Sequence, residues 1–217
     1  VLNIVPIINE YSFILTPEHF LYLPVVGGII VFALIIKQLI SLNHLRAIAV
    51  VVCLGLGAQT IYQNTFWSGE IPLFERMVSF EGEFARGHML LAKAYFSNKQ
   101  TDWAIDHYNQ SLRIMKMYAL KATNDKARRF YQGFIKEINF YLAQCFTAKG
   151  QLDQAIAYYK EALQIDSRDV SLLNNLAVCY IQQGDKSQAE QILKIALGFN
   201  PLYIPARENL NRLINSQ

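Results

Sequence analysis

The sequence predicts an all-α fold in which a transmembrane helical hairpin precedes a solenoid of helical repeats. Two long uncharged runs, 20–36 and 47–67, predict the hairpin. Matched residues 34 positions apart in the second half of the chain predict the solenoid. The composition agrees with this division, because 53% of the residues are hydrophobic and only 17% are charged. Such a chain is too apolar for an ordinary soluble repeat protein.

The repeat is visible when residues 151–163 are aligned with residues 185–197. Five pairs of matched residues are each 34 positions apart: Ala143 and Ala177, Gly150 and Gly184, Ala155 and Ala189, Tyr159 and Leu193, and Ala162 and Ala196. This spacing is the period of the tetratricopeptide repeat (TPR), in which small residues recur where two antiparallel helices approach closely. One such unit cannot bury its apolar face alone, so we expect neighbouring units to stack.

These patterns predict the domain organisation. Residues 1–19 are interpreted as the end of a preceding hydrophobic segment and a non-cytoplasmic loop, 20–67 as two transmembrane helices, and 68–83 as a connector with a short helix after Pro72. The TPR domain is expected over 84–217, with repeats at 84–116, 135–169 and 170–203 and a capping helix at 204–217.

The first repeat differs from the others. Ala92 and Ala143 are 51 residues apart, which is one period plus 17. The extra residues predict two longer facing helices with a turn near 123–126, and Thr101 or Asp102 is the expected N-cap of the second helix. The basic insertion over 116–134 has two interpretations, a solvated helix face or a contact with anionic lipid headgroups.

The loops predict the orientation of the membrane hairpin. The first run has 17 residues without a charge and continues to Ile40, which is close to the roughly 20 residues that cross a bilayer, and a buried soluble helix is its alternative. The connection between the two runs carries Lys37 and Arg46 and no acid, whereas Glu10, Glu18 and Glu70 flank the hairpin. Because basic loops stay in the cytoplasm, the TPR domain is expected on the non-cytoplasmic side, in a bacterial periplasm or exterior or an ER lumen.

The sequence predicts no metal site and no cofactor. The net charge of +3 is modest and does not indicate a nucleic-acid surface. Three cysteines give no disulfide framework, and Cys145 and Cys179 are expected to be buried free thiols on repeat helices.

A protein or peptide partner is expected on the concave face, which the first helix of each repeat lines. Asn175 and Asn209 are 34 residues apart, and side-chain amides at one repeat distance can bind the backbone of an extended peptide. Leu90 and Tyr141 interrupt this ladder, and ordinary polar surface is the alternative. The candidate groove residues are Arg86, Lys93, Phe96, Phe140, Gln144, Asn174, Asn175 and Asn209.

One segment outside the repeats has the character of a motif. Glu18-His19-Phe20-Leu21-Tyr22-Leu23-Pro24, followed by Gly27, resembles a segment of the transmembrane and tetratricopeptide-repeat-containing O-mannosyltransferases, which are GT-C-class glycosyltransferases. Residues 3–6, and residues 64–67 together with Leu73-Phe74, resemble further segments of that family.

The resemblance implies a polytopic enzyme that uses a lipid-phosphate-linked sugar, with Glu18, His19 and Tyr22 flanking the donor entrance. Anchoring by Phe20 and Tyr22 at the membrane interface is the alternative for this segment. His19 stands where the family often has Arg. The family's catalytic acidic loop lies in an early span that this chain lacks, so no catalytic residue is expected here and the chain alone should be inactive as a transferase.

Two functions are consistent with these observations. The first is the C-terminal segment of a polytopic membrane glycosyltransferase whose TPR domain binds a protein acceptor or partner, close to membrane lipid and a lipid-linked sugar. The second is a non-catalytic, membrane-anchored TPR scaffold for protein–protein interaction.

Overall fold

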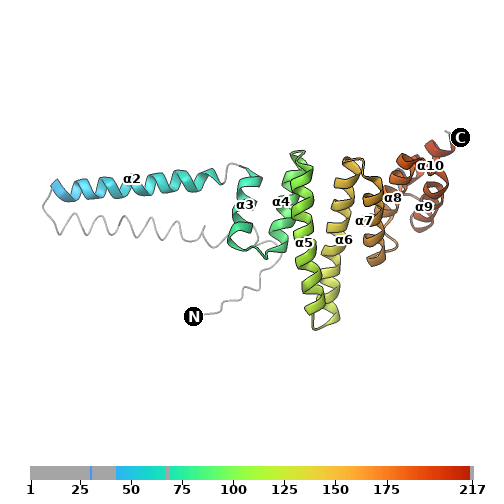
Figure 1. Ribbon diagram of the computed structural model, residues 1–217, viewed down its shortest axis with the longest axis horizontal. Helices are drawn as coiled ribbons and strands as arrows, with labels where there is room; N and C mark the ends of the chain where they lie inside the picture. The colour runs from blue at the N-terminus through green and yellow to red at the C-terminus, as the bar shows by residue number, and fades with distance from the viewer. Residues whose placement is uncertain (1–29, 31–42, 67–68, 216–217) are drawn as a thin grey trace. The chain divides into compact units, whose positions relative to one another are not determined.

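The structure is a computed structural model that describes residues 30, 43–66 and 69–215. The described residues form α-helices and connecting turns, with no β-strand among them (Figure 1). The chain divides into two compact units, 1–64 and 65–217. Helix α2 (Asn43–Thr65) lies almost wholly in the first unit, and the second unit holds helices α3 to α10.

Helix α2 coincides with the second expected membrane span. It is 23 residues long, and Val51, Leu54 and Ile61 are among its exposed apolar side chains. In the part of the chain that the structure describes, no helix is both long enough and apolar enough to cross a membrane. The expected span at 47–67 overlaps α2 and stays a prediction. The expected segments 1–19 and 20–36 lie outside the described residues, apart from Ile30.

The second unit is a succession of paired helices, which is the TPR-like solenoid that the 34-residue period predicts. A short helix, α3 (Glu70–Phe80), precedes the array and packs against α4. The array consists of α4 (Ala85–Ser97), α5 (Thr101–Lys121), α6 (Asp125–Ala148), α7 (Leu152–Ile165), α8 (Val170–Gln183), α9 (Lys186–Phe199) and α10 (Ile204–Asn215). Each helix packs against the next along the chain, and α10 also contacts α8.

Small residues at the repeat positions allow the helices to approach closely. Nine of the described alanines are fully excluded from solvent: Ala92, Ala104, Ala143, Ala155, Ala162, Ala177, Ala189, Ala196 and Ala206. Large side chains fill the space between hairpins at one position of each repeat, namely Tyr108, Tyr159 and Leu193, and none of them is more than 2% exposed. Protein interiors are close-packed, so this alternation of small and large residues fixes the register of the stack.

The turns and helix ends of the array have distinct local structures. Gly150 and Gly184 have φ angles of 72° and 86°, and Gly184 caps the C-terminus of α8 in the left-handed conformation that glycine adopts without strain. Neither predicted N-cap of α5, Thr101 or Asp102, is the N-cap, because α5 begins at Thr101 and Gln100 precedes it without a side-chain cap. Helix α3 begins at Glu70, so Pro72 lies in its first turn, where its missing N–H leaves no helical hydrogen bond unmade.

The hairpin of α5 and α6 is longer than the others. These helices have 21 and 24 residues, whereas α4, α7, α8 and α9 have 13 or 14. Their far ends project beyond the neighbouring helices of the array (Figure 1). The connection falls at residues 122–124, and Asn124 caps α6 by accepting a hydrogen bond from the Ala127 amide at 2.8 Å. The predicted lengthening of this hairpin is confirmed.

The three cysteines of the chain occupy two different environments. Cys145 and Cys179 are buried in the repeat core, and burial raises the pKa of the Cys145 thiol to about 12. The Thr147 hydroxyl lies 3.4 Å from the Cys179 sulfur. Cys53, on α2, is exposed. All three are free thiols, so the repeats are held together by packing and not by disulfides.

Candidate functional site

A hollow lies between α6 and the start of α8, which are the first helices of two successive repeats. Its volume is about 390 Å³. The residues that line it are Gly133, Lys136, Glu137, Phe140, Tyr141, Asp169, Ser171 and Leu172. The hollow is therefore formed by the helices that the sequence assigns to the peptide-binding face.

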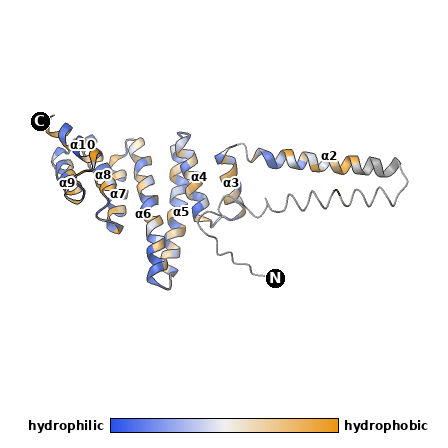
Figure 2. Cartoon of the chain, turned by 180° about the vertical axis from the view of Figure 1, so that it is seen from behind, coloured by the Kyte–Doolittle hydropathy of each residue, from blue (hydrophilic) through white to orange (hydrophobic). Residues whose placement is uncertain are grey.

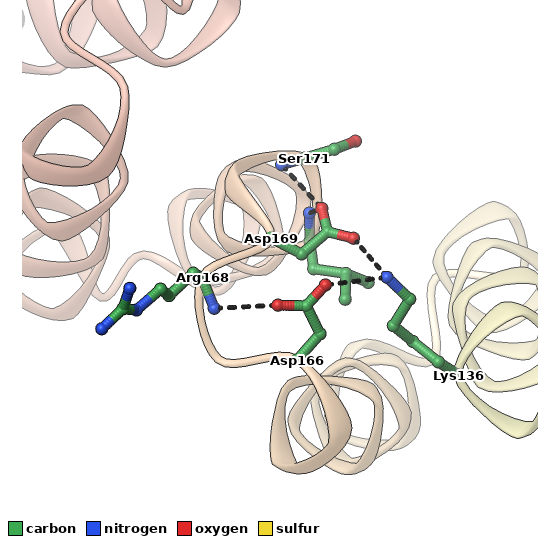
Figure 3. A network of polar contacts seen from close by, with 6 residues as sticks. Lys136, Asp166, Arg168, Asp169 and Ser171 are labelled. Atoms are coloured by element: carbon green, nitrogen blue, oxygen red, sulfur yellow. Dashed lines mark hydrogen bonds and ion pairs between the residues drawn. The ribbon is translucent and has the colours of Figure 1, made fainter. Parts of the chain in front are cut away.

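Lys136 connects α6 to the turn between α7 and α8. Its Nζ lies 3.0 Å from Oδ2 of Asp166 and 3.1 Å from Oδ2 of Asp169 (Figure 3). The remaining oxygens of the two carboxylates accept backbone hydrogen bonds. Oδ1 of Asp169 accepts from the amides of Ser171 and Leu172, and Oδ1 of Asp166 accepts from the Arg168 amide at 3.3 Å.

This network fixes one edge of the hollow. Asp169 is the N-cap of α8 and also pairs with Lys136 on α6. One carboxylate therefore joins the first helices of two successive repeats. The hydrogen bond from Lys136 lowers the pKa of Asp166. Burial lowers the pKa of Lys136, but its bonds to the two carboxylates outweigh burial and raise the pKa overall. Both partners therefore remain charged at neutral pH.

Helix α4 supplies a second cation next to the aromatic part of the hollow. Lys93 Nζ lies 3.7 Å from Oε1 of Glu137 and 4.6 Å from the centre of the Tyr141 ring. Burial lowers the pKa of Lys93, but the interactions with Tyr141 and Glu137 raise it overall. The Tyr141 ring stacks on buried Tyr108, with 5.6 Å between the centroids and 6° between the planes. Two aromatic rings are thus held rigidly beside a paired charge.

The structure distributes the predicted groove residues unevenly. Phe140 lines the hollow. Arg86 and Lys93, on α4, contact α6, and the Arg86 guanidinium lies 5.4 Å from the centre of the Phe134 ring. Phe96 and Gln144 are half-buried on α4 and α6 and do not line the hollow. Glu18, His19 and Tyr22, the predicted donor-entrance residues, lie outside the described residues.

Two of the predicted groove asparagines are bonded to each other, and the proposed ladder of Asn175 and Asn209 stays a prediction. Nδ2 of Asn209, on α10, donates a hydrogen bond of 2.9 Å to Oδ1 of Asn174, on α8. Asn174 is only 7% exposed. Asn209 therefore uses one of its amide donors inside the protein. Asn175, which follows Asn174 on α8, is half-buried. Asn174 and Asn209 contribute to the packing of two first helices in addition to any contact with a ligand.

Sequence reasoning missed Lys136, Asp166 and Asp169. Asp169 had a recognisable signal, because an Asp directly before the first apolar residue of a predicted helix is a typical N-cap. Lys136 had none, because its partners are 30 and 33 residues away along the chain. Among the described residues, no group of three or more His, Cys, Asp and Glu side chains is placed to hold a metal ion.

Comparison with known proteins agrees with the repeat register. Residues 137–207 match the tetratricopeptide repeat family. The photosystem I assembly proteins Ycf3 of Prochlorococcus marinus strains NATL1A and NATL2A are each 34% identical to this chain over 71 residues, and the match covers 30% of this chain. The chain spans 41% of the length of these curated relatives.

Solved structures support the fold. The crystal structure of MamA has a TM-score of 0.57 at 13% identity, covering 71% of this chain and 81% of that one. The C-terminal TPR-containing domain of a Plasmodium falciparum FK506-binding protein has a TM-score of 0.51 at 20% identity, covering 61% of this chain and 87% of that one. At these identities the likeness concerns the fold alone. The repeat period, the buried small residues and the family match together identify a tetratricopeptide repeat domain in the second unit of this chain.

Proposed function

We propose that the TPR domain is a protein-interaction scaffold that binds an extended segment of a partner protein in the hollow between α6 and α8. The observation that carries the proposal is the combination of a 390 Å³ hollow with rigidly held aromatic and charged side chains. TPR arrays create extended concave surfaces through the small rotation between repeats, and those surfaces bind polypeptides.

The site is organised before any ligand arrives. Lys136 is held by two carboxylates, Lys93 by Glu137 and Tyr141, and the Tyr141 ring by Tyr108. Side chains that are already ordered lose little rotamer freedom on binding, so more of the contact energy appears as affinity. We expect the aromatic rings to take an apolar side chain of the partner and the paired charges to orient its backbone.

A glycine on α6 offers a direct test. Gly133 lines the hollow, and a Cβ atom added there would meet no atom within 4 Å, so Gly133→Phe adds a ring at the wall of the hollow. Gly198, on α9, is matched, since a Cβ there also meets nothing within 4 Å and the residue does not line the hollow. Unstructured twelve-residue peptides selected from a random displayed library against the full chain would be titrated by fluorescence anisotropy.

We expect Gly133→Phe to weaken the selected peptides at least tenfold and Gly198→Phe to leave their affinity unchanged. Equal affinity for both variants would show that the peptides bind elsewhere and would overturn the assignment of this hollow. Circular dichroism of both variants checks that the helices are intact. Replacing Asn175 and Asn209 together tests whether the asparagines add contacts to the same peptides.

The motif at residues 18–24 supports a second proposal, that the chain is the C-terminal segment of a membrane glycosyltransferase of the O-mannosyltransferase type. In that case the TPR domain lies on the non-cytoplasmic side and binds the protein acceptor, and Glu18, His19 and Tyr22 flank the donor entrance. Sequencing the coding region upstream of Val1 tests this. An in-frame series of further spans with an acidic loop after the first supports it, and a start codon close to Val1 overturns it.

A further inference from the structure

The far end of the α5–α6 hairpin combines positive charge with exposed apolar side chains. We call residues 113–130 the hairpin tip. It carries six cations, Arg113, Lys116, Lys121, Lys126, Arg128 and Arg129, against one acid, Asp125. Lys116 lies 3.5 Å from Glu161 on α7, and Arg128 lies 2.8 Å from Asp125. The other four cations form no ion pair with any described residue.

Apolar residues lie among these charges. Leu120 is 86% exposed and Phe130 is 55% exposed. A hollow of about 570 Å³ runs along this part of α5, and its lining includes Leu112, Met117 and Leu120 together with Arg113, Lys116 and Lys121. Most of the tip is coloured hydrophilic in Figure 2, with apolar residues between the polar ones. Leu120 and Phe130 bury little of their apolar area within this chain, so the hydrophobic effect gains little from them in the folded protein alone.

We propose that the hairpin tip binds the surface of a membrane that contains anionic lipids. The unpaired cations would meet lipid phosphates and carboxylates, and Leu120 and Phe130 would enter the headgroup region. This surface shares no residue with the hollow between α6 and α8, so the proposal is independent of peptide binding.

The geometry favours a membrane over an acidic polypeptide as the partner. The tip projects beyond the neighbouring helices (Figure 1), and its cations come from the end of α5 and the start of α6. A planar anionic surface can meet cations distributed around a projecting end, whereas a single extended peptide contacts one side of it. Exposed leucine and phenylalanine beside lysine and arginine are also the composition of segments that lie at membrane interfaces.

The test is flotation of the full chain with phosphatidylcholine vesicles and with vesicles that contain about three parts in ten of phosphatidylserine. The measured quantity is the ratio of the two binding constants, which removes any charge-independent adsorption by other apolar segments. Each basic residue near an anionic surface contributes about fivefold to binding, so the triple variant Lys121→Gln, Lys126→Gln, Arg129→Gln should lower the ratio on the order of a hundredfold. The preference should also fall as salt rises.

The matched control is Lys99→Gln, Lys160→Gln, Arg207→Gln, which removes the same charge from exposed positions outside the tip. We expect it to keep the preference of the wild type. Leu120→Ser should weaken binding to the anionic vesicles about tenfold, and Leu202→Ser, at a residue that is 79% exposed, should not.

Three results would overturn the proposal. The first is a wild-type chain that does not distinguish the two kinds of vesicle. The second is an equal loss in the tip variant and the control variant, which would indicate a general charge effect. The third is capture of polyglutamate by the tip without any preference for anionic vesicles, which would assign the surface to an acidic polypeptide.

Discussion

The Nδ1 atoms of His88 and His107 lie 3.0 Å apart, and the two imidazole rings stack with 5.2 Å between their centroids. Nε2 of His88 lies 3.1 Å from the carbonyl oxygen of Gly82. A carbonyl can only accept, so Nε2 of His88 carries the hydrogen, and Nδ1 of a neutral His88 accepts from Nδ1–H of His107. This tautomer assignment makes His107 the ring that has a nitrogen left to take up a proton.

The histidine pair predicts a loss of stability in acid. Burial and His88 lower the pKa of His107, and Asp106 and Glu75 only partly oppose them. The unfolded chain then binds a proton at His107 more readily than the folded chain, so the free energy of unfolding falls as pH drops from about 6.5 through the lower folded pKa. Thermal unfolding at pH 7 and pH 5 measures the effect.

The variant His107→Gln provides the comparison, because glutamine keeps a donor for His88 but does not titrate. Its melting temperature should fall less between pH 7 and pH 5 than that of the wild type. An identical fall in both proteins would assign the acid sensitivity to other groups.

Lys136 and Asp169 predict a graded series of stabilities. Lys136→Met removes two ion pairs whose side chains are only partly exposed and should lower the free energy of unfolding by about 1 kcal/mol. Asp169→Ala also removes the cap of α8 and should cost about 2 kcal/mol in total. Asp169→Asn keeps a cap oxygen and should resemble Lys136→Met. Urea denaturation followed by circular dichroism gives the order, and a larger loss for Asp169→Asn than for Asp169→Ala would contradict it.

The contact between α8 and α10 predicts that two repeat-equivalent asparagines differ. Asn209→Ala leaves the amide oxygen of buried Asn174 without its donor, so it should lower the free energy of unfolding by about 1–2 kcal/mol. Asn175→Ala, on the half-buried surface of α8, should change stability by less than about 0.5 kcal/mol. The same denaturation experiment separates them. Equal losses would mean that the hydrogen bond between α8 and α10 does not stabilise the array.

Two glycines with equal space around them predict opposite effects of an added methyl group. A Cβ meets no atom within 4 Å at either Gly184 or Gly133. Gly184 has a φ angle of 86°, where an L-residue is strained, so Gly184→Ala should destabilise by about 1–2 kcal/mol. Gly133 lies inside α6, where alanine is the better helix former, so Gly133→Ala should stabilise by about 0.5–1 kcal/mol. Differential scanning calorimetry measures both, and a shared sign would refute this account.

The sequence predicted the array well because packing constrains each repeat locally. Ala143 and Ala177 had to be small, and Gly150 and Gly184 had to adopt positive φ, so the chain repeats its chemistry at the spacing of its structure. The contacts that shape the candidate site are different. Lys136 finds its carboxylates 30 and 33 residues away, and His88 meets His107 across two helices. Such pairs depend on the helix-to-helix register, which no local pattern contains.

The helix over 43–65 shows where an apolar run gives less information. Hydrophobic residues at 47–58 predict burial, but they do not distinguish a membrane span from another environment. The long α5–α6 hairpin was predictable from the interval of 51 residues between Ala92 and Ala143. The ion pair between Lys116, on this hairpin, and Glu161, on α7, was not predictable.

The burial of Cys145 and Cys179 makes this chain convenient for spectroscopy. A maleimide reagent needs an accessible thiolate, and the repeat core withholds two of the three sulfurs. Cys53 stands exposed on α2. A fluorophore or spin label can therefore be attached at a single native position, without mutagenesis and without disturbing the repeats. A second label on a cysteine introduced in the TPR domain would then report distances between the first unit and the TPR domain during ligand binding.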